Sequence, residues 1–391
     1  MISKPNLCNM KQGWEIKKLG EVCTFCSGYT PKGNELNNEG LIPYFKVSDM
    51  NHRENIKYLT HTTLFLERGC KVYPKHTIVF PKNGAAIATN KKRILQEDSV
   101  IDLNTAGVIA DKSIVYHEYL YLYLLGLDFR QYTRGGAVPT LDIAELKNKQ
   151  IPVPPLAEQE RIVAELDCLS GVIEKKKQQL KELDALAQSI FYEMFGDPIT
   201  NEKGWEVKKL GDIASSQIGV TYKPENISED NEGIVILRSG NIQDSEINLS
   251  DIVRINCSIK EQKFVQKGDI LMCSRNGSAR LVGKVAMIPE LSERMAYGAF
   301  MTIIRSNHQH YLFEFFKSQY FRMQLTSAQT STINQITVKM LNDIKLSLPP
   351  LPLQQAFASK IEAIEKQKEL IKQSIKEVET LFNSRMDYYF N

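Results

Sequence analysis

An eight-residue block occurs twice in this chain of 391 residues and constrains its fold more than any other feature. The block reads Gly-Trp-Glu-Ile-Lys-Lys-Leu-Gly from Gly13 and recurs, with one Ile-to-Val change, from Gly204, which is 191 residues later. The two copies hold the only two tryptophans of the chain. The sequence therefore predicts a tandem duplication.

Further matches follow in the same order at nearly the same spacing, which chance would not produce. Five segments of the first half have counterparts in the second: 28–31 with 219–224, 44–50 with 236–242 when Lys46 is aligned with Arg238, 75–84 with 268–277, 138–141 with 333–336, and 154–156 with 349–351. Short apolar runs that lead into Asn-Gly turns, and segments rich in Tyr, Phe and Leu, predict strands and short helices. We therefore expect two mixed α/β modules, 1–155 and 196–348.

Each module is followed by a long apolar-periodic segment that begins at Pro-Pro-Leu, a typical helix start. The predicted helices are 156–195 and 349–391, each roughly 60 Å long at ~1.5 Å per residue. Their apolar positions recur in steps of three and four and define a coiled-coil seam: Ile162, Leu166, Leu169, Ile173, Leu180, Leu183, Ile361, Ile364, Ile371, Ile375 and Val378. We expect the two helices to pair antiparallel, because a whole module separates them along the chain. The alternative is that each helix packs on its own module.

Basic and amide side chains gather in several predicted loops of both modules. Arg, Asn and Gln can read base edges with paired hydrogen bonds, and Lys can hold phosphates. The candidate nucleic-acid contacts are Lys46, Ser48, Lys82, Asn83, Lys91, Lys92, Arg93 and Arg134 in the first module, and Arg238, Ser239, Asn241, Arg275, Asn276 and Arg280 in the second. Taken singly, each of these residues could equally lie in an ordinary solvated turn.

Motifs for nucleotide binding or catalysis are missing from the sequence. It has no Gly-x-x-x-x-Gly-Lys-Ser/Thr loop and no Gly-x-Gly-x-x-Gly after a strand. Both Pro-Pro pairs follow an aliphatic residue, so neither fits an amino-methyltransferase motif. Glu261, Gln262 and Lys263, with Asp251 upstream, have the residue types of a metal-dependent nuclease, but the first module has no counterpart. We predict no catalytic residue, no metal site and no bound cofactor.

Composition places the chain in a broad class. Its net charge is +3, and no segment approaches the ~18 consecutive apolar residues of a membrane span. The first residues lack the apolar core of a signal peptide, so we expect a cytoplasmic protein. Seven scattered cysteines are typical of reduced thiols, and the Cys23–Cys26 spacing has no second pair to form a zinc site.

The pattern resembles the specificity subunits of type I restriction–modification systems. The resemblance is carried by the two Gly-Trp-Glu-x-Lys-Lys-Leu-Gly blocks, the two Pro-Pro-Leu starts and the segment 194–198, Met-Phe-Gly-Asp-Pro, and it extends over the whole chain. The first helix start, 154–163, is close to the family pattern. The second lacks the Glu and Arg of the first, so its partner contacts are expected to differ.

The resemblance implies the fold and the function of each part. The modules would be target-recognition domains that each read one half of a bipartite double-stranded DNA sequence. The helices would set the spacing and bind two modification subunits, which carry S-adenosylmethionine and methylate adenine. Restriction subunits would add ATP- and Mg²⁺-dependent translocation and cleavage. This chain itself would be non-catalytic.

Two other functions stay open at the level of sequence. One is a stand-alone nuclease, and the other is a coiled-coil scaffold protein without a DNA role.

Overall fold

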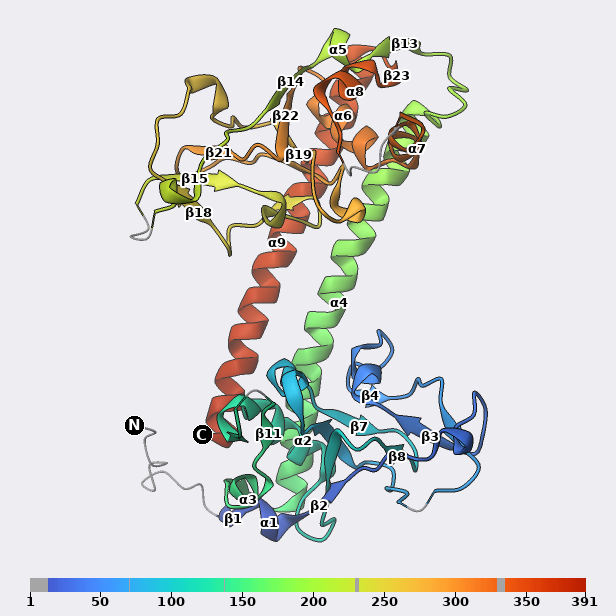
Figure 1. The fold of residues 1–391 in the computed structure, drawn as a ribbon, viewed down its shortest axis with the longest axis vertical. Helices are drawn as coiled ribbons and strands as arrows, with labels where there is room; N and C mark the ends of the chain where they lie inside the picture. The colour runs from blue at the N-terminus through green and yellow to red at the C-terminus, as the bar shows by residue number, and fades with distance from the viewer. Residues whose placement is uncertain (1–12, 70, 137, 229–231, 329–334) are drawn as a thin grey trace. The chain divides into compact units, whose positions relative to one another are not determined.

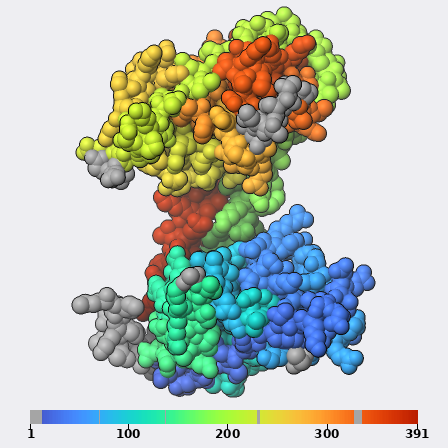
Figure 2. Space-filling view, in the orientation of Figure 1, coloured from blue at the N-terminus to red at the C-terminus, as the bar shows by residue number. Residues whose placement is uncertain are grey.

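The structure is a computed structural model that describes residues 13–69, 71–136, 138–228, 232–328 and 335–391. The chain divides into two compact units, of which the first is discontinuous in sequence and the second is continuous. The first comprises Met1–Lys177 and Gln373–Asn391, and the second comprises Gln178–Lys372. In the space-filling view, the first module is blue to teal and the second is yellow-green to orange (Figure 2).

The first module is built on a five-stranded sheet of order β2-β9-β6-β7-β4 and a three-stranded sheet of order β5-β3-β8 (Figure 1). Strand β1 pairs with β12, and β10 pairs with β11. The strands are β1 (Glu15–Lys18), β2 (Cys23–Ser27), β3 (Ile42–Phe45), β4 (Tyr58–Leu59), β5 (Phe65–Leu66), β6 (Ile78–Pro81), β7 (Arg93–Leu95), β8 (Val100–Ile101), β9 (Thr105–Ala110), β10 (Thr133–Arg134), β11 (Thr140–Leu141) and β12 (Gln150–Val153).

Three helices belong to this module: α1 (Leu19–Val22), α2 (His117–Gly126) and α3 (Ile143–Lys147). Every residue from Tyr119 to Leu124 of α2 is buried, which explains why this segment is apolar on all sides. The Asp142 carboxylate caps α3 by accepting hydrogen bonds from the backbone N–H groups of Ala144 and Glu145.

The second module repeats this arrangement. A four-stranded sheet has the order β14-β22-β19-β20, a three-stranded sheet has the order β18-β15-β21, and β13–β23 and β16–β17 are separate pairs. The elements are β13 (Glu206–Lys209), α5 (Leu210–Ile213), β14 (Ser215–Ile218), β15 (Ile234–Leu237), β16 (Ile242–Gln243), β17 (Glu246–Ile247), β18 (Val253–Ile255), β19 (Ile270–Cys273), β20 (Val285–Met287), β21 (Met295–Tyr297), β22 (Met301–Arg305), α6 (Gln309–Lys317), α7 (Gln319–Ala328), α8 (Val338–Asp343) and β23 (Lys345–Leu348).

The predicted duplication is confirmed by equivalent hydrogen bonds. Each Gly-Trp-Glu block forms a strand that pairs with the strand just before a Pro-Pro pair, with Glu15 opposite Val153 and Glu206 opposite Leu348. A Cβ atom added to Gly28 would lie 2.0 Å from the carbonyl oxygen of Asp102, and one added to Gly219 would lie 2.2 Å from that of Tyr297. Both positions therefore require glycine because the backbones approach so closely.

The two long helices are α4 (Leu156–Phe195) and α9 (Leu351–Phe390) (Figure 1). A buried glutamine fixes the start of each. Gln159 Nε2 donates to the carbonyl of Pro154 at 2.8 Å, and Gln354 Nε2 donates to that of Pro349 at 2.7 Å. Gly196, with a φ of 78°, adopts the left-handed conformation that ends α4.

In both units α4 and α9 run antiparallel, as predicted. In the first unit Tyr389 Oη donates to Glu165 Oε2 at 2.6 Å. In the second unit Lys368 Nζ lies 2.9 Å from Asp184 Oδ1, and the rings of Phe195 and Phe357 are 5.0 Å apart. All eleven predicted seam residues are buried or half-buried, and Lys368 occupies a buried position among them.

The cores also include residues from both helices, which corresponds in part to the alternative that each helix packs on its own module. Ile162 and Leu166 of α4 and Tyr389 of α9 belong to the core of the first module. Phe191 of α4 and Phe357 of α9 belong to the core of the second. Pairing with each other and packing on the modules are thus combined, and each module is completed by one end of each helix.

Within the described residues, no helix is long and apolar enough to cross a membrane. The described cysteines are free thiols, and Cys8 and Cys70 lie outside the described residues. Cys23 and Cys26 both lie in β2, where burial raises the pKa of each thiol to about 12. A raised pKa leaves little of the thiolate, the form that binds metals and reacts in redox exchange, at neutral pH.

Candidate nucleic-acid interface

In the first module, the loop after β6 lies against the hairpin formed by β10 and β11. Asn83 bridges to Thr140, and the backbone N–H of Leu141 donates to the carbonyl of Lys82 at 2.8 Å. Thr140 is in turn paired with Arg134 across the hairpin. Lys82, Asn83 and Arg134, which are up to 52 residues apart in the chain, therefore come together on neighbouring backbone segments.

The second module places the loop after β19 in the same way. Arg275 bridges to Gln335, and the backbone N–H of Ile336 donates to the carbonyl of Ser274 at 2.7 Å. The Arg275 guanidinium lies 5.4 Å from the ring centre of Phe300, and both side chains are exposed. Residues 333 and 334, which the sequence comparison aligned with 138 and 139, lie outside the described residues.

These bonds correct the sequence alignment of the two loops by one residue. The sequence comparison aligned Lys82 with Arg275, but the shared hydrogen bond makes Lys82 equivalent to Ser274. Asn83 is then equivalent to Arg275, which agrees with the two bridges. Motif matching chose the wrong register because both loops contain an Asn-Gly pair, whereas strand pairing is set by the backbone.

Two residues of this cluster were missed at the level of sequence. The Lys82 N–H donates to the carbonyl of Asn104 at 2.8 Å, and the Ser274 N–H donates to that of Phe300 at 2.9 Å, so Asn104 and Phe300 are equivalent. Asn83 Nδ2 donates to Asn104 Oδ1 at 3.3 Å, where the second module has the Arg275–Phe300 contact. Each lies more than 20 residues along the chain from the loop that it contacts. Only an alignment of the equivalent strands of the two modules could have identified Asn104 and Phe300 from the sequence.

The alignment of Lys46 with Arg238 is supported. Lys46 precedes the 3₁₀ turn η3 (Val47–Asn51), and Arg238 precedes η7 (Ser239–Asn241). In each, the backbone N–H of the basic residue donates to the side chain three residues on, Asp49 or Asn241. Lys46 and Ser48 are exposed, whereas the Arg238 guanidinium pairs with Asp251 at 3.1 Å.

The second-module turn lies next to the Arg275 loop. Asn276 Nδ2 donates to Ser239 Oγ at 3.1 Å, which joins the two predicted loops into one cluster. Arg280 is exposed at the start of the 3₁₀ turn η9 (Ala279–Leu281). Asn241 is different, because it is buried and its amide donates to the carbonyls of Asn248 and Asp251. The prediction that Asn241 contacts DNA is wrong, since its amide is used inside the module.

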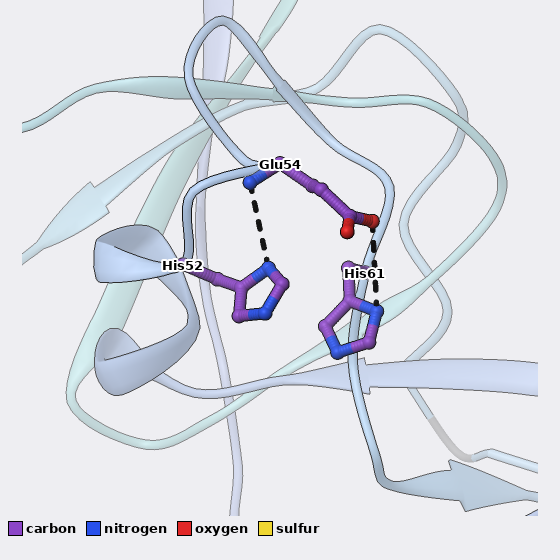
Figure 3. Close-up of side chains that lie close together, drawn as sticks. All are labelled: His52, Glu54 and His61. Atoms are coloured by element: carbon purple, nitrogen blue, oxygen red, sulfur yellow. Dashed lines mark hydrogen bonds and ion pairs between the residues drawn. The ribbon is translucent and has the colours of Figure 1, made fainter. Parts of the chain in front are cut away.

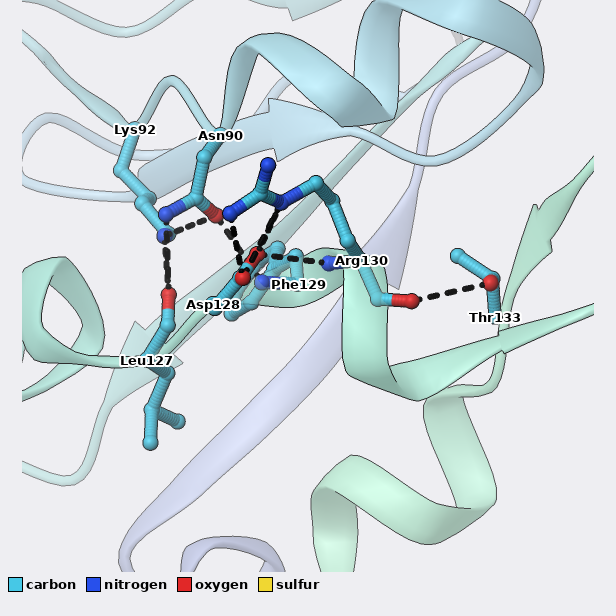
Figure 4. Close-up of polar contacts among 7 residues, drawn as sticks. All are labelled: Asn90, Lys92, Leu127, Asp128, Phe129, Arg130 and Thr133. Carbon is cyan, nitrogen blue, oxygen red and sulfur yellow. Dashed lines mark hydrogen bonds and ion pairs between the residues drawn. The ribbon is translucent and has the colours of Figure 1, made fainter. Parts of the chain in front are cut away.

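Lys92 was also assigned incorrectly. Its side chain is fully buried, and its ammonium donates to Asn90 Oδ1 and to the carbonyl of Leu127, each at 2.7 Å (Figure 4). Arg93 is half-buried and donates to the backbone carbonyls of Met50, Asn55 and Lys92. A run of basic residues resembles a solvated patch, but here Lys92 is buried and the Arg93 guanidinium is bound by backbone carbonyls of the module.

Side-chain bonds orient several of the remaining candidates. Lys82 Nζ donates to Ser27 Oγ, Lys91 Nζ donates to Asn51 Oδ1, and Arg134 pairs with Asp142. Burial lowers the pKa of Lys82, although the Asp102 carboxylate partly opposes this shift.

The residue types of a nuclease do not form a free carboxylate cluster. Asp251 is paired with Arg238, and the Glu261 carboxylate is paired with Arg294, whose guanidinium lies 3.9 Å from the Phe264 ring centre. The Arg294 pair lowers the pKa of Glu261.

Comparison with known proteins identifies the family. The model of the type I restriction modification DNA specificity domain matches residues 11–185 and again residues 202–380. The chain belongs to this family. The two matches coincide with the two halves of the duplication.

Relatives of this family match along almost the entire chain. The MjaIX specificity subunit of a type I restriction enzyme from Methanocaldococcus jannaschii is 23% identical over 90% of this chain and 86% of its own length. The EcoKI specificity subunit from Escherichia coli K12 is 21% identical over 91% of this chain and 82% of its own.

Solved structures agree in fold. The S subunit of a type I restriction–modification system from M. genitalium superposes with a TM-score of 0.54 at 14% identity, covering 98% of both chains. A second chain, from a structure describing complex assembly and conformational transition of the type I R-M system, has a TM-score of 0.59 at 20% identity, covering 97% of this chain and 98% of its own. Tandem α/β modules joined by long helices are thus the fold of type I specificity subunits.

Proposed function

We propose that this specificity subunit reads a bipartite DNA sequence, with one half-site for each module. One observation carries the proposal. Two modules with the same strand frame have different side chains at one equivalent loop cluster, namely Lys82, Asn83 and Asn104 in the first and Ser274, Arg275 and Phe300 in the second. Two modules that recognise different DNA sequences require the same strand arrangement but different polar side chains in the loops that contact the bases.

The helices α4 and α9 have a separate role in the proposal. They set the half-site spacing and bind two modification subunits through faces that point away from the seam, because the seam residues are buried. The chain is non-catalytic in this proposal. S-adenosylmethionine, ATP and Mg²⁺ act on the modification and restriction subunits.

Sequencing of methylated bases in cells with and without the gene tests the proposal. We expect adenine methylation at one bipartite motif to be lost when the gene is deleted and regained when it is restored. An unchanged methylation pattern would contradict the proposal.

Variants of the loop cluster test which module reads which half. Arg275→Ala and Asn83→Ala should each weaken binding of the assembled complex at one half-site by roughly 1–3 kcal/mol and relax base preference there. Lys82→Ala should weaken the same half-site as Asn83→Ala with less effect on base preference. Binding is measured with targets mutated in either half.

Arg294→Ala is the matched control, because Arg294 is also an exposed arginine stacked on a phenylalanine of the second module. Unchanged sequence preference in all loop variants would exclude these loops as readers. DNA cleavage by the purified chain with Mg²⁺ alone would favour a nuclease instead. Failure to bind DNA of any sequence at low salt would favour a scaffold protein.

A further inference from the structure

Two histidines and a glutamate of the first module lie close together between η3 and the segment after β4. His52 caps the end of η3, Glu54 follows in the loop, and His61 lies just beyond β4 (Figure 3). One possible ligand atom from each side chain lies within 4.8 Å of those of the other two. Among the described residues, this is the one group of three His, Cys, Asp or Glu side chains with such spacing.

The loop that carries these side chains is held by one buried residue, Asn55. Its backbone N–H donates to the carbonyl of His52 at 3.0 Å, and its side-chain Nδ2 donates to the carbonyl of His61 at 2.7 Å. Its Oδ1 accepts from the backbone N–H of His61 at 2.9 Å. Both histidine backbones are therefore tied to the same residue, His52 to its backbone and His61 to its side chain, so folding alone brings the imidazoles together.

Arg93 also holds the backbone of the loop that carries His52. Its guanidinium donates to the carbonyl of Asn55 and, at 3.1 Å, to that of Met50 in η3. The segment is thus anchored on both sides of His52. Ligands on a pre-organised backbone lose less conformational entropy when they bind an ion than ligands on a mobile loop.

The contacts within the group are long and few. Glu54 Oε2 lies 3.9 Å from His61 Nδ1, and the Glu54 backbone N–H lies 3.4 Å from His52 Nδ1. The imidazoles are stacked with centroids 4.0 Å apart and planes 16° from parallel. About half of the Glu54 side chain, 54%, and 42% of that of His61 are exposed, so an ion can reach them from solvent.

We propose that His52, Glu54 and His61 form a transition-metal site that binds Zn²⁺ or a similar ion. Two imidazole nitrogens and one carboxylate oxygen are a known three-residue zinc set that leaves a fourth position for water or an external ligand. Bonds of about 2.0–2.2 Å place tetrahedral ligand atoms about 3.4 Å apart. Rotation about the imidazole and carboxylate torsions, which are soft, closes the present spacing and turns the ring nitrogens inward.

The ligand types set the selectivity of the site. Imidazole suits Zn²⁺, Ni²⁺ and Cu²⁺, whereas Mg²⁺ and Ca²⁺ require sets made mostly of oxygen atoms. The site is therefore distinct in chemistry from the Mg²⁺ expected on restriction subunits.

An ion here would act on one module alone. It would join the end of η3, the turn that Lys46 precedes and that contains Ser48, to the segment after β4. Asn51, next to His52, also accepts a hydrogen bond from Lys91. In the corresponding part of the second module, residues 238–257 contain no histidine, and Glu246 is paired with Lys368 and Lys372. Metal would thus stiffen the loop of the first module only.

Metal titration of the purified, chelator-treated full chain tests the proposal. We expect one high-affinity Zn²⁺ per chain by calorimetry, and a Co²⁺ spectrum of tetrahedral type without the charge-transfer band of a thiolate ligand. The second readout separates this site from the cysteines. We expect the metal affinity to fall by roughly tenfold or more in each of three variants, His52→Gln, His61→Gln and Glu54→Gln. Loss of a residue that only supports a ligand already has an effect of this size.

His76→Asn is the matched control, because His76 and His117 form a second stacked pair in the same module, with centroids 3.9 Å apart, outside this three-residue group. Its metal affinity should equal that of the original chain. The proposal is wrong if the original chain and all three ligand variants bind the metal equally well. It is also wrong if the Co²⁺ spectrum shows a thiolate band, or if His76→Asn loses as much metal affinity as the ligand variants. Circular dichroism of the ligand variants confirms that they fold, and Glu54→Gln removes a ligand without changing either imidazole.

Discussion

Lys92 shows how a single charge can be part of the interior. Its ammonium has two hydrogen-bond acceptors and lies 4.1 Å from the ring centre of Phe129. Among the described residues no carboxylate forms an ion pair with it, and desolvation lowers its pKa to about 7, a shift that the more distant Asp128 only partly opposes. The residue joins the start of β7 to the end of α2, and a charge in this position costs stability while it is protonated.

The pH dependence of unfolding should report this residue. The folded pKa of about 7 lies below the ordinary value of 10.5, so between these values the unfolded chain binds more protons. The free energy of unfolding should therefore rise with pH across that window, by on the order of 1 kcal/mol per pH unit from this group. Lys92→Met should remove this part of the slope in urea titrations at several pH values.

Lys91→Met is the control for Lys92→Met, because Lys91 is the adjacent lysine and is only half-buried. Its pH slope should match that of the original chain. Equal slopes in Lys92→Met and the original chain would mean that Lys92 is not buried as a titrating group.

At the scale of elements, α4 and α9 are parts of the modules as much as a link between them. Leu166 of α4 is fully buried in the first core, and Ile364 of α9 is buried in the second. Glu165 of α4 binds Arg385 and Tyr389 of α9, and these contacts lower the pKa of Glu165 to about 2. Substitutions on the seam therefore act on the stability of a unit before they act on any partner.

Leu166→Ala should lower the stability of the first unit by roughly 2–5 kcal/mol, because it leaves a cavity in a packed core. Leu381→Ala on α9, in the same unit, should change stability by no more than about 0.5 kcal/mol, since Leu381 is 49% exposed. Trp14 is the tryptophan of the first unit and Trp205 that of the second. Fluorescence in a Trp205→Phe background therefore reports unfolding of the first unit. Equal loss in both leucine variants would contradict the shared-core packing.

At the scale of the whole molecule, the first compact unit is made of two separate segments of the chain, whereas the second is one continuous segment. The last part of α9, Gln373–Asn391, belongs to the unit that contains the N-terminal module. Phe382, Met386, Tyr389 and Phe390 pack on its core. The first module is thus complete only when a helix end from the far end of the sequence is added.

Ending the chain after Lys372 should therefore destabilise the first unit and leave the second folded. Hydrogen exchange should become faster at the buried strand β6, while β19 keeps its protection. A chain that lacks only Asn391 serves as the control. Unchanged exchange at β6 would show that the first module does not need α9, and equal acceleration at β19 would show that the two units unfold together.

The amino-acid sequence by itself determined the duplication, the two modules, the long helices and the apolar seam. Each of these is a repeating pattern that can be found by spacing alone, and the predicted start and end of the first helix agree with Leu156–Phe195. The antiparallel direction also followed, because the chain must pass through a module between the helices.

The tertiary structure alone decided which polar side chains of the candidate interface are exposed and which core each helix end completes. Lys92 is interior because Leu127, 35 residues away, supplies an acceptor, and Asn241 is interior because two later carbonyls take its amide. The pairing of Asn83 with Thr140 and of Arg275 with Gln335 set the register of the loops. Burial and register depend on contacts between distant segments, and neither the composition nor the periodicity of a local segment contains that information.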